Sequence, residues 1–471
     1  MENNIIRAGF KNTIFVLVSQ TTTFVLGVAK NLILPIALGI TNFGYWQVYL
    51  LYSSYVMILD LGFSDGINLR YGKYNYDDLP RQTFKSSIRL YIIIQFIFVL
   101  VTALIIFFEP DINKRIAMLW VSINIPIFGL TTVLISILHT TNRMKKYSFY
   151  IMVDKVIMII AIIAILLFSI KNFYLVIIAD TFSRLIALGL LIYTCRDFVI
   201  GKCDIKGLGF AETKQNIKVG VVLLIAYFLN FFVLGFGRLI VERFEPVDVY
   251  SVYSFSMSTM YLVLVFVTAI GIVIYPTLNR LNTERFSLYF IELNKLLGIV
   301  VYILLISYYP LKLFVINYMS DFIGIFEYLP FIYAAIFVQS KMLILINPYY
   351  KLLREEKAML KANILGLVTA IIFIAISYVI WQSVLLIAVS TLIAILIRLY
   401  MSELYIKSKL KIEGNLNILV ELAGLILFIF FSYFNNLYIG IFGYFVFVVL
   451  YTISNFNTLL KFKKYFLNKE K

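Results

Sequence analysis

Apolar stretches of about 20 residues, separated by short polar connections, recur along almost the whole sequence. A helix needs roughly 20 apolar residues to cross a bilayer, whereas a strand of a membrane barrel needs about 10 and alternates apolar with polar positions. The stretches fit the helix, so the pattern predicts an all-α membrane protein with about 14 transmembrane helices. The predicted spans are 13–37, 44–68, 86–108, 116–138, 150–169, 173–194, 217–241, 250–275, 295–317, 327–346, 359–380, 383–402, 417–434 and 437–456.

The composition indicates the same class. Hydrophobic residues make up 62% of the 471 residues, charged residues make up 14%, and the mean hydropathy is +0.93. Soluble domains carry about 25% charged residues, so the composition argues against a soluble globular protein. The chain holds a single histidine, which argues against a histidine-rich metal site. We expect neither a metal nor a cofactor.

The net charge of +16 is distributed unevenly between alternate connections. The basic connections lie around residues 70–89, 143–146, 196–218, 280–295, 351–361 and 407–411. The intervening connections hold only Lys114, Arg115, Lys171, Arg243 and Lys312. Basic residues mark the cytosolic side of a membrane protein and meet anionic lipid there, so the charge predicts orientation and not a nucleic-acid partner. Both termini are expected in the cytosol.

A polar stretch at 195–216 divides the chain into two halves that look like repeats. The stretch "KNLILPIALGITNFGYWQVYLLYSS" overlays without a gap on "GRLIVERFEPVDVYSVYSFSMSTMY", and Lys30 and Arg238 fall one position apart. Such internal repeats are common in secondary transporters. We therefore predict an N-lobe at 1–194, a cytosolic inter-lobe loop at 195–216, a C-lobe at 217–402, and two further helices with a basic tail at 403–471.

Four short motifs resemble those of Wzx-type polysaccharide flippases, which share a superfamily with MATE drug exporters and the lipid II flippase. They are "KNLILPIALGITNFGY", "DLGFSDGINLRYG", "GRLIVERFEPVDVYSVYS" and "IYPTLNRL". Two positions depart from the family's pattern: Gly237 stands where an acidic residue is common, and Ser251 replaces a glycine. The resemblance therefore does not carry an acid–base role to the seventh span.

The resemblance implies a MATE-like fold of two six-helix lobes plus two carboxy-terminal helices. It also implies a flippase that moves undecaprenyl-diphosphate-linked oligosaccharide repeat units, the precursors of O-antigen or capsule, across the bacterial inner membrane by alternating access. A polysaccharide polymerase and a chain-length regulator would be its protein partners. Membrane lipids would surround it.

Three basic side chains fall inside predicted spans: Lys30, Arg184 and Arg238. A charge near the bilayer centre costs on the order of 3 kcal/mol or more, so such a side chain snorkels to the surface, pairs, or meets a ligand. A diphosphate crossing the membrane needs cations, which makes these residues candidates for substrate binding. Arg70, at the cytosolic end of the second span, is a candidate for first capture, and positive-inside topology is its alternative explanation.

Acidic residues inside the spans are candidate charge partners. Asp180 precedes Arg184, and Glu242 follows Arg238, by one helical turn, so each couple can pair along one helix face. Asp60 has no basic neighbour in sequence, so we expect either ion coupling, with a proton or sodium, or a salt bridge to Lys30. Two further cations, Lys341 and Arg398, are close enough to span ends to snorkel.

Two other functions compete with the flippase. A MATE-type multidrug or cation antiporter shares the fold but would be expected to have more acidic than basic residues inside its helices. A membrane polysaccharide polymerase would be expected to have a long outer loop with clustered charged residues, and the outer connections here are short. The sequence also shows no nucleophile elbow or phosphate-cradling glycine loop, so we do not expect an enzyme.

Overall fold

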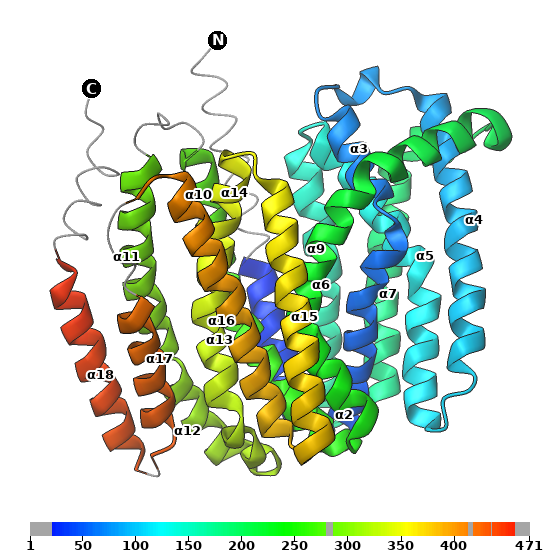
Figure 1. Ribbon diagram of the computed structural model, residues 1–471. Helices are drawn as coiled ribbons and strands as arrows, with labels where there is room; N and C mark the ends of the chain where they lie inside the picture. The colour runs from blue at the N-terminus through cyan, green and yellow to red at the C-terminus, as the bar shows by residue number, and fades with distance from the viewer. Residues whose placement is uncertain (1–20, 279–285, 413–417, 435, 457–471) are drawn as a thin grey trace. The chain divides into compact units, whose positions relative to one another are not determined.

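The computed structural model describes residues 21–278, 286–412, 418–434 and 436–456. In this part of the chain the regular structure is helical throughout and no strand is present, as predicted (Figure 1). Twelve helices are long and apolar enough to cross a membrane, and Ile418–Ser432 is a shorter apolar helix. The chain forms two compact units: Met1–Phe228 with Pro246–Ser251, and Leu229–Glu245 with Val252–Lys471.

The first unit contains all elements up to the first part of α9. They are η1 (Ala29–Ile33), α2 (Leu34–Tyr55), η2 (Val56–Asp60), α3 (Phe63–Tyr71), η3 (Tyr76–Asp78), α4 (Arg81–Ile106), α5 (Ile112–Thr140), α6 (Met144–Leu167), α7 (Phe173–Thr194), α8 (Arg196–Val199), η4 (Ile205–Gly209) and α9 (Phe210–Phe244). Helix α5 packs against α2, α3, α4 and α7, and about two thirds of its apolar window is buried, so it is the centre of this unit.

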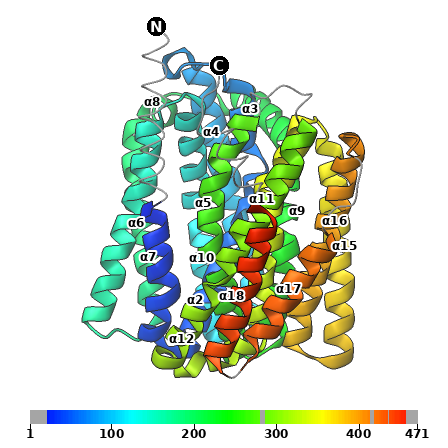
Figure 2. The same cartoon turned by 90° about the vertical axis from the view of Figure 1, so that its left-hand side faces the viewer.

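The helical stretch Thr21–Asp60 is two spans and not one, because the chain reverses at Gly39. Gly39 has φ 73° and ψ 173°, a conformation that glycine adopts without the strain that a side chain would bring. In an uninterrupted helix Lys30 and Trp46 would be about 24 Å apart. Instead the Lys30 ammonium lies 5.3 Å from the centre of the Trp46 ring. Figure 2 shows the first helical segment, in dark blue, beside α6 and α7.

The corresponding break in the second half falls where the sequence overlay places it. Pro246 lies opposite Gly39 in the overlay, and the chain leaves α9 after Phe244 and enters α10 (Val247–Leu278) just beyond it. Proline cannot continue a preceding helix, whereas at the start of a new helix its missing N–H is harmless. Different residues therefore make the same break in the two halves.

The second unit contains the rest of α9 and all later elements. They are α10, α11 (Phe286–Leu305), α12 (Tyr308–Tyr318), η6 (Ser320–Glu327), α13 (Leu329–Lys341), η7 (Met342–Ile346), α14 (Asn347–Leu352), α15 (Glu356–Trp381), α16 (Val384–Lys409), α17 (Ile418–Ser432) and α18 (Leu437–Ser454). The stretch Leu329–Leu352 is the centre of this unit, because 89% of its apolar window is buried. Helices α17 and α18 pack against each other and against α11 (Figure 1).

Where the structure describes them, the fourteen predicted apolar ranges coincide with helices once the break at Gly39 and the short α17 are taken into account; residues 13–20 and 417 of these ranges lie outside the described part. The segment 195–216, predicted as a loop, is instead largely helical, since it holds α8, η4 and the first turns of α9. It is ordered by burial of Cys195 and Phe198 and by a hydrogen bond of 2.9 Å from the Asp204 N–H to Ser86 Oγ. The predicted lobe boundaries and the cytosolic termini stay predictions; most of the terminal residues lie outside the described ranges.

Candidate functional site

Lys30 lies in η1, a short π-helical turn in the first transmembrane segment, and pairs with a residue from α7. Its Nζ atom is 2.6 Å from Asp180 Oδ1, and the Trp46 ring lies beside the ammonium. The Lys30 side chain is 16% exposed and that of Asp180 is 3% exposed. A π-turn inserts an extra residue into the helical register and re-aims the side chains that follow, and such turns are frequent at functional sites. Here it carries the lysine whose partner is 150 residues away.

Asp180 is shared by three groups. Besides Lys30, Arg184 Nη2 lies 2.8 Å from Asp180 Oδ2, and the Tyr49 hydroxyl donates to the same oxygen at 2.9 Å. The predicted pair of Asp180 and Arg184, one turn apart on α7, is therefore present in the structure. Charge-assisted hydrogen bonds of this kind are about twice as strong as neutral ones. They connect three of the transmembrane segments of the first unit at one carboxylate.

A second carboxylate lies beside this cluster, on α6. Lys155 Nζ is 2.7 Å from Asp154 Oδ2, and the Ser183 hydroxyl donates to Asp154 Oδ1 at 2.9 Å. Asp154, Lys155 and Arg184 all line a cavity of about 240 Å³, together with the hydroxyl-bearing Thr131 and Thr132. The cavity lining therefore includes charged groups of both signs.

We define the charged cluster as Lys30, Asp154, Lys155, Asp180 and Arg184. It contains three cations and two carboxylates, so its formal charge is one positive. Lys30, Arg184 and Lys155 are 16%, 23% and 28% exposed, Asp154 is 19% exposed, and Asp180 is the most buried member at 3%. The carboxylate that binds two of the cations is thus less exposed than either of them. This arrangement favours an anionic ligand.

The predicted salt bridge between Asp60 and Lys30 is wrong. Asp60 instead accepts from the Tyr91 hydroxyl at 2.7 Å, from the Ser64 hydroxyl at 2.8 Å, and from the Ser64 N–H at 3.1 Å. The chain breaks after Asp60, where Leu61 and Gly62 both have positive φ, and the carboxylate then caps the first turn of α3. Its role in ion coupling stays a prediction, and the geometry gives it a capping role.

Arg70, on α3, is held by α9. Its guanidinium makes a bidentate pair with Glu212, with Nη1–Oε1 at 2.6 Å and Nη2–Oε2 at 3.1 Å, and it also donates to Asn216 and Gln215. The Tyr71 hydroxyl donates to Glu212 at 2.9 Å, and burial together with that carboxylate raises the pKa of Tyr71. These contacts give Arg70 a structural partner, and diphosphate capture by Arg70 stays a prediction.

Three glycines allow α3 and α9 to approach so closely. A Cβ atom on Gly66 would lie 2.1 Å from the Asn216 carbonyl oxygen, and one on Gly220 would lie 1.9 Å from the Gly62 carbonyl oxygen. No side chain fits at such distances, since the neighbouring atoms are backbone. The bond between Arg70 and Glu212 is therefore positioned by backbone contact between the two helices.

Arg238 and Glu242 lie on the part of α9 that belongs to the second unit, and both are buried. Arg238 Nε donates to Ser254 Oγ at 3.0 Å. The pair of Arg238 with Glu242 and a role of Arg238 in substrate binding stay predictions. Gly237 is packed against α16, because a Cβ atom there would lie 2.9 Å from Thr391 Oγ1. A side chain at position 237 would therefore have to displace Thr391 and Ile387.

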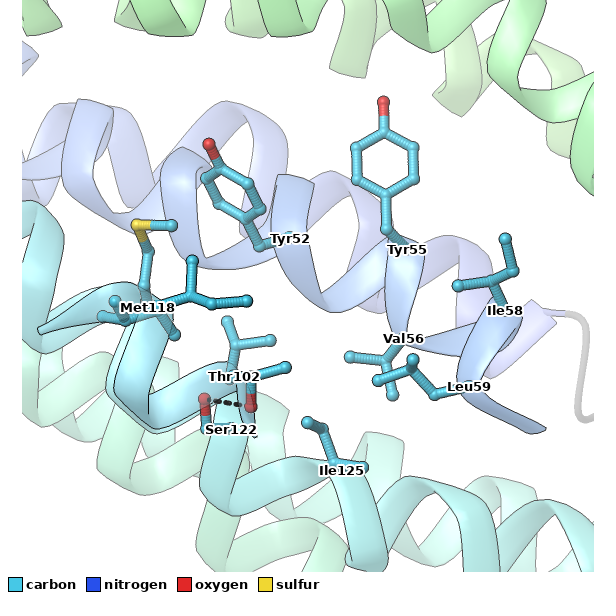
Figure 3. Close-up of a pocket in the computed structure, with 12 residues that line it drawn as sticks. Tyr52, Tyr55, Val56, Ile58, Leu59, Thr102, Met118, Ser122 and Ile125 are labelled. Atoms are coloured by element: carbon cyan, nitrogen blue, oxygen red, sulfur yellow. Dashed lines mark hydrogen bonds between the residues drawn. The ribbon is translucent and has the colours of Figure 1, made fainter. Parts of the chain in front are cut away.

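An apolar cavity of about 290 Å³ lies in the first unit, between α2, η2, α4 and α5 (Figure 3). Its lining is apolar apart from two tyrosines and a hydrogen bond of 2.9 Å between Thr102 and Ser122. Figure 3 shows the hydroxyls of Tyr52 and Tyr55 pointing away from that hydrogen bond. The cavity therefore offers hydrocarbon surface and little else.

Sequence reasoning identifies Lys30, Arg184 and Asp180 but gives no role to Asp154 and Lys155. These adjacent residues lie near a span end, where a charged pair is expected to be interfacial. Their alignment with Ser183 depends on how α6 packs against α7, which hydropathy does not report. The sequence signal that could have identified Asp154 and Lys155 is that two adjacent charged residues interrupt an apolar stretch.

The comparisons agree with this architecture. The chain is similar in structure to the lipid II flippase MurJ in an inward closed conformation, with a TM-score of 0.67, 14% identity, and coverage of 96% of this chain and 100% of that chain. It is also similar to an inward-facing multidrug resistance MATE family transporter of the MOP superfamily, with a TM-score of 0.58, 15% identity, and coverage of 82% and 96%. The MATE multidrug transporter DinF-BH gives a TM-score of 0.57 at 12% identity, with coverage of 85% and 95%.

At these identities the likeness shows a shared fold. No curated protein matches the sequence. The profile of the family described as polysaccharide biosynthesis protein matches residues 10–282, which is more than half of the chain. The match includes the charged cluster and all four motifs on which the resemblance to flippases rests. Transport by this chain stays a prediction. The chain belongs to the polysaccharide biosynthesis protein family.

Proposed function

We propose that the protein is a flippase that moves undecaprenyl-diphosphate-linked oligosaccharide repeat units from the cytosolic to the outer leaflet of the bacterial inner membrane. The observation that carries the proposal is the charged cluster, in which the cations Lys30 and Arg184 are partly exposed and share the buried carboxylate of Asp180. A diphosphate carries two or more negative charges and several acceptor oxygens. It can therefore compete with Asp180 for Lys30 and Arg184.

In this mechanism the cluster exchanges partners. Without substrate, Asp180 is shared by Lys30 and Arg184, offsets one of their two positive charges and lowers the cost of holding both in the bilayer. When the diphosphate binds, its oxygens take over one or both cations. Departure of the diphosphate restores the bonds to Asp180, so the same carboxylate helps to release the substrate. The guanidinium of Arg184 can contact two phosphate oxygens at once, whereas Lys30 acts as a point charge.

The lipid part of the substrate needs no polar site. Undecaprenyl is a hydrocarbon chain, and the apolar cavity lined by Val56, Leu59 and Ile125 offers a matching surface in the same unit as the charged cluster. The neighbouring face of α4 exposes Leu100, Leu104 and other apolar side chains, as a lipid-facing helix does. The lipid tail can therefore stay in or beside the bilayer while the cations bind the diphosphate.

The proposal is tested in a strain that lacks the gene and makes a known surface glycan. We expect lipid-linked repeat units to collect on the cytosolic face and surface polysaccharide to disappear. Wild-type protein should restore export, while Lys30→Met and Arg184→Met should not. Lys171→Met is the matched control, because Lys171 is an exposed lysine in a connection. Normal surface polysaccharide in the deletion strain would contradict the proposal.

A binding measurement separates charge recognition from folding. Purified wild-type protein in nanodiscs should bind undecaprenyl diphosphate more tightly than undecaprenol, and Lys30→Met should reduce this preference by about tenfold, which corresponds to about 1.4 kcal/mol. Each variant must first show the wild-type unfolding midpoint within error. Equal affinity of the wild type for the charged and the uncharged lipid would overturn the role of the cluster.

A cation antiporter is the competing function within this fold. We would expect its carboxylates to outnumber its cations, yet the cluster holds three cations and two carboxylates, and Asp180, the most buried member, pairs with two of the cations. The net positive charge therefore favours an anionic substrate. Transport of a cationic dye by the wild type, abolished by Asp180→Asn, would support the antiporter instead.

A further inference from the structure

Three ionisable side chains meet in the interior of the second unit, away from the charged cluster. They are Lys341 at the end of α13, Glu403 on α16 and Glu421 on α17. Their side chains are 0%, 1% and 3% exposed. We call them the buried triad. The prediction that Lys341 snorkels to the membrane surface is wrong, because its ammonium turns inward to two carboxylates; Arg398 is also fully buried.

One ammonium serves both carboxylates. Lys341 Nζ donates to Glu421 Oε1 at 2.9 Å and to Oε2 at 2.8 Å, and it is also in direct contact with Glu403 Oε1. Among the described residues, Lys341 is the cation that pairs with either carboxylate. With all three groups ionised, the triad would carry one uncompensated negative charge.

The two carboxylates differ in their other contacts. Asn294 Nδ2 and the Tyr400 hydroxyl both lie 3.5 Å from Glu421 oxygens, so further donors lie at the outer limit of hydrogen bonding beside the bidentate ammonium. Glu403 Oε2 has no hydrogen-bond partner in the described part of the chain, and it is fully buried. Glu421 is therefore the better-solvated carboxylate, and Glu403 is the one that lacks donors.

The other charged or titratable groups around the triad do not supply the missing positive charge. Arg398, on the same helix as Glu403, turns its guanidinium to Asn230 at 2.9 Å. Tyr302, on α11, donates to the Glu421 backbone carbonyl at 3.1 Å and packs edge-on against Tyr451 of α18. These tyrosines are neutral, and their hydroxyls do not reach Glu403.

An uncompensated charge in a site this deeply buried is expensive. An unpaired carboxylate in a low-dielectric interior costs several kcal/mol, and a second carboxylate on the same nitrogen adds repulsion. Uptake of one proton removes both the cost of the unpaired carboxylate and the repulsion between the two carboxylates. It leaves a neutral triad of Lys341, ionised Glu421 and protonated Glu403.

We propose that the buried triad is a proton-binding site, with Glu403 as the group that takes and releases the proton. The inference depends only on contacts within the second unit and not on the proposed transport activity. Because Glu403 and Glu421 sit on different helices, loss of the proton makes them repel and weakens the attachment of α17 to α13 and α16. Proton binding therefore holds α17 in place.

The test is infrared difference spectroscopy of the purified full-length protein in nanodiscs, between about pH 6 and about pH 9, a range in which exposed carboxyls are almost fully ionised. We expect a buried protonated carboxyl band in the wild type at low pH, equivalent to about one proton per chain, that is lost as the pH rises. Glu403→Gln should remove the band. Glu356→Gln, at an exposed position, is the matched control and should leave it unchanged.

Replacement of either glutamate by glutamine leaves one ammonium with one carboxylate, so these variants imitate the protonated site and are expected to fold. The unfolding temperature of the wild type should fall as the pH rises through the titration of the site, whereas Glu403→Gln and Glu421→Gln should lack that decline. A wild-type spectrum without a carboxyl band would overturn the proposal. So would a band that survives in Glu403→Gln or a pH dependence that is the same in wild type and both variants.

Discussion

Replacing Asp180 by asparagine tests the charged cluster most directly. Asparagine has nearly the same size and shape as aspartate, so the change removes the negative charge and creates no cavity. Three donors then lose their ionic acceptor: Lys30 at 2.6 Å, Arg184 at 2.8 Å and Tyr49 at 2.9 Å. Two of them are cations in a largely buried position.

The expected loss of stability follows from these contacts. A hydrogen bond to a charged group contributes about 1.5–3 kcal/mol, and removing one partner of a buried ion pair costs about 3–5 kcal/mol. Polar contacts between transmembrane helices average only about 0.6 kcal/mol, because the unfolded state in the membrane also finds partners. Taking both effects together, we expect Asp180→Asn to reduce the free energy of unfolding by about 3 kcal/mol.

The assay is reversible unfolding of the purified protein in mixed micelles, followed by circular dichroism. Tyr49→Phe, which removes one neutral donor, should cost about 1 kcal/mol. The double variant of Lys30→Met and Asp180→Asn should be more stable than additivity predicts, by about 1–2 kcal/mol, because it also removes one stranded cation. Asp197→Asn, at an exposed position, serves as control. If Asp180→Asn unfolded like wild type, the cluster would not be an ion-paired network.

Three further predictions concern regions outside the spans. In thermal unfolding, Arg70→Lys should destabilise the protein nearly as much as Arg70→Ala, because lysine cannot make the bidentate pair with Glu212. Wild-type stability of the lysine variant would instead mean that only the positive charge at position 70 matters. Backbone N–H groups hold the pKa of Asp204 below its usual value, so the stability it gives to η4 is present above about pH 4 and is lost as the pH falls through the lowered pKa; hydrogen exchange should show this, and Asp204→Ala should lack the pH dependence. Burial raises the pKa of the Cys195 thiol to about 11, so a membrane-impermeant maleimide should label Cys203 and not Cys195. The label should reach Cys203 only from the cytosolic side, and labelling from outside would reverse the predicted orientation.

The number and position of the helices could be predicted because one physical quantity controls them. A segment that crosses hydrocarbon must bury all its backbone hydrogen bonds in a helix and must be apolar over about 20 residues. Hydropathy reports this length directly. Helix ends are less visible: α9 begins at Phe210, ahead of the predicted start at 217, because its polar first turns are stabilised by contacts such as the one between Glu212 and Arg70.

The partners of the charged residues were only partly predictable. Asp180 and Arg184 are one turn apart on one helix, so their pairing follows from the helical period. From the sequence, Lys30 could equally have paired with Asp60. It pairs with Asp180 because α7 packs beside the first transmembrane segment. Lys341 likewise turns inward because two helices far along the chain present carboxylates to it.

The sequence by itself thus determined the class of protein, the succession of helices and the family, since these depend on composition, on local periodicity and on short motifs. The tertiary structure alone decided which charges meet, which of them are accessible, and where a carboxylate is left without donors. Those properties depend on the packing of helices that are more than a hundred residues apart in some cases, and the free energy of an ionised side chain in a membrane is set by the few atoms that surround it.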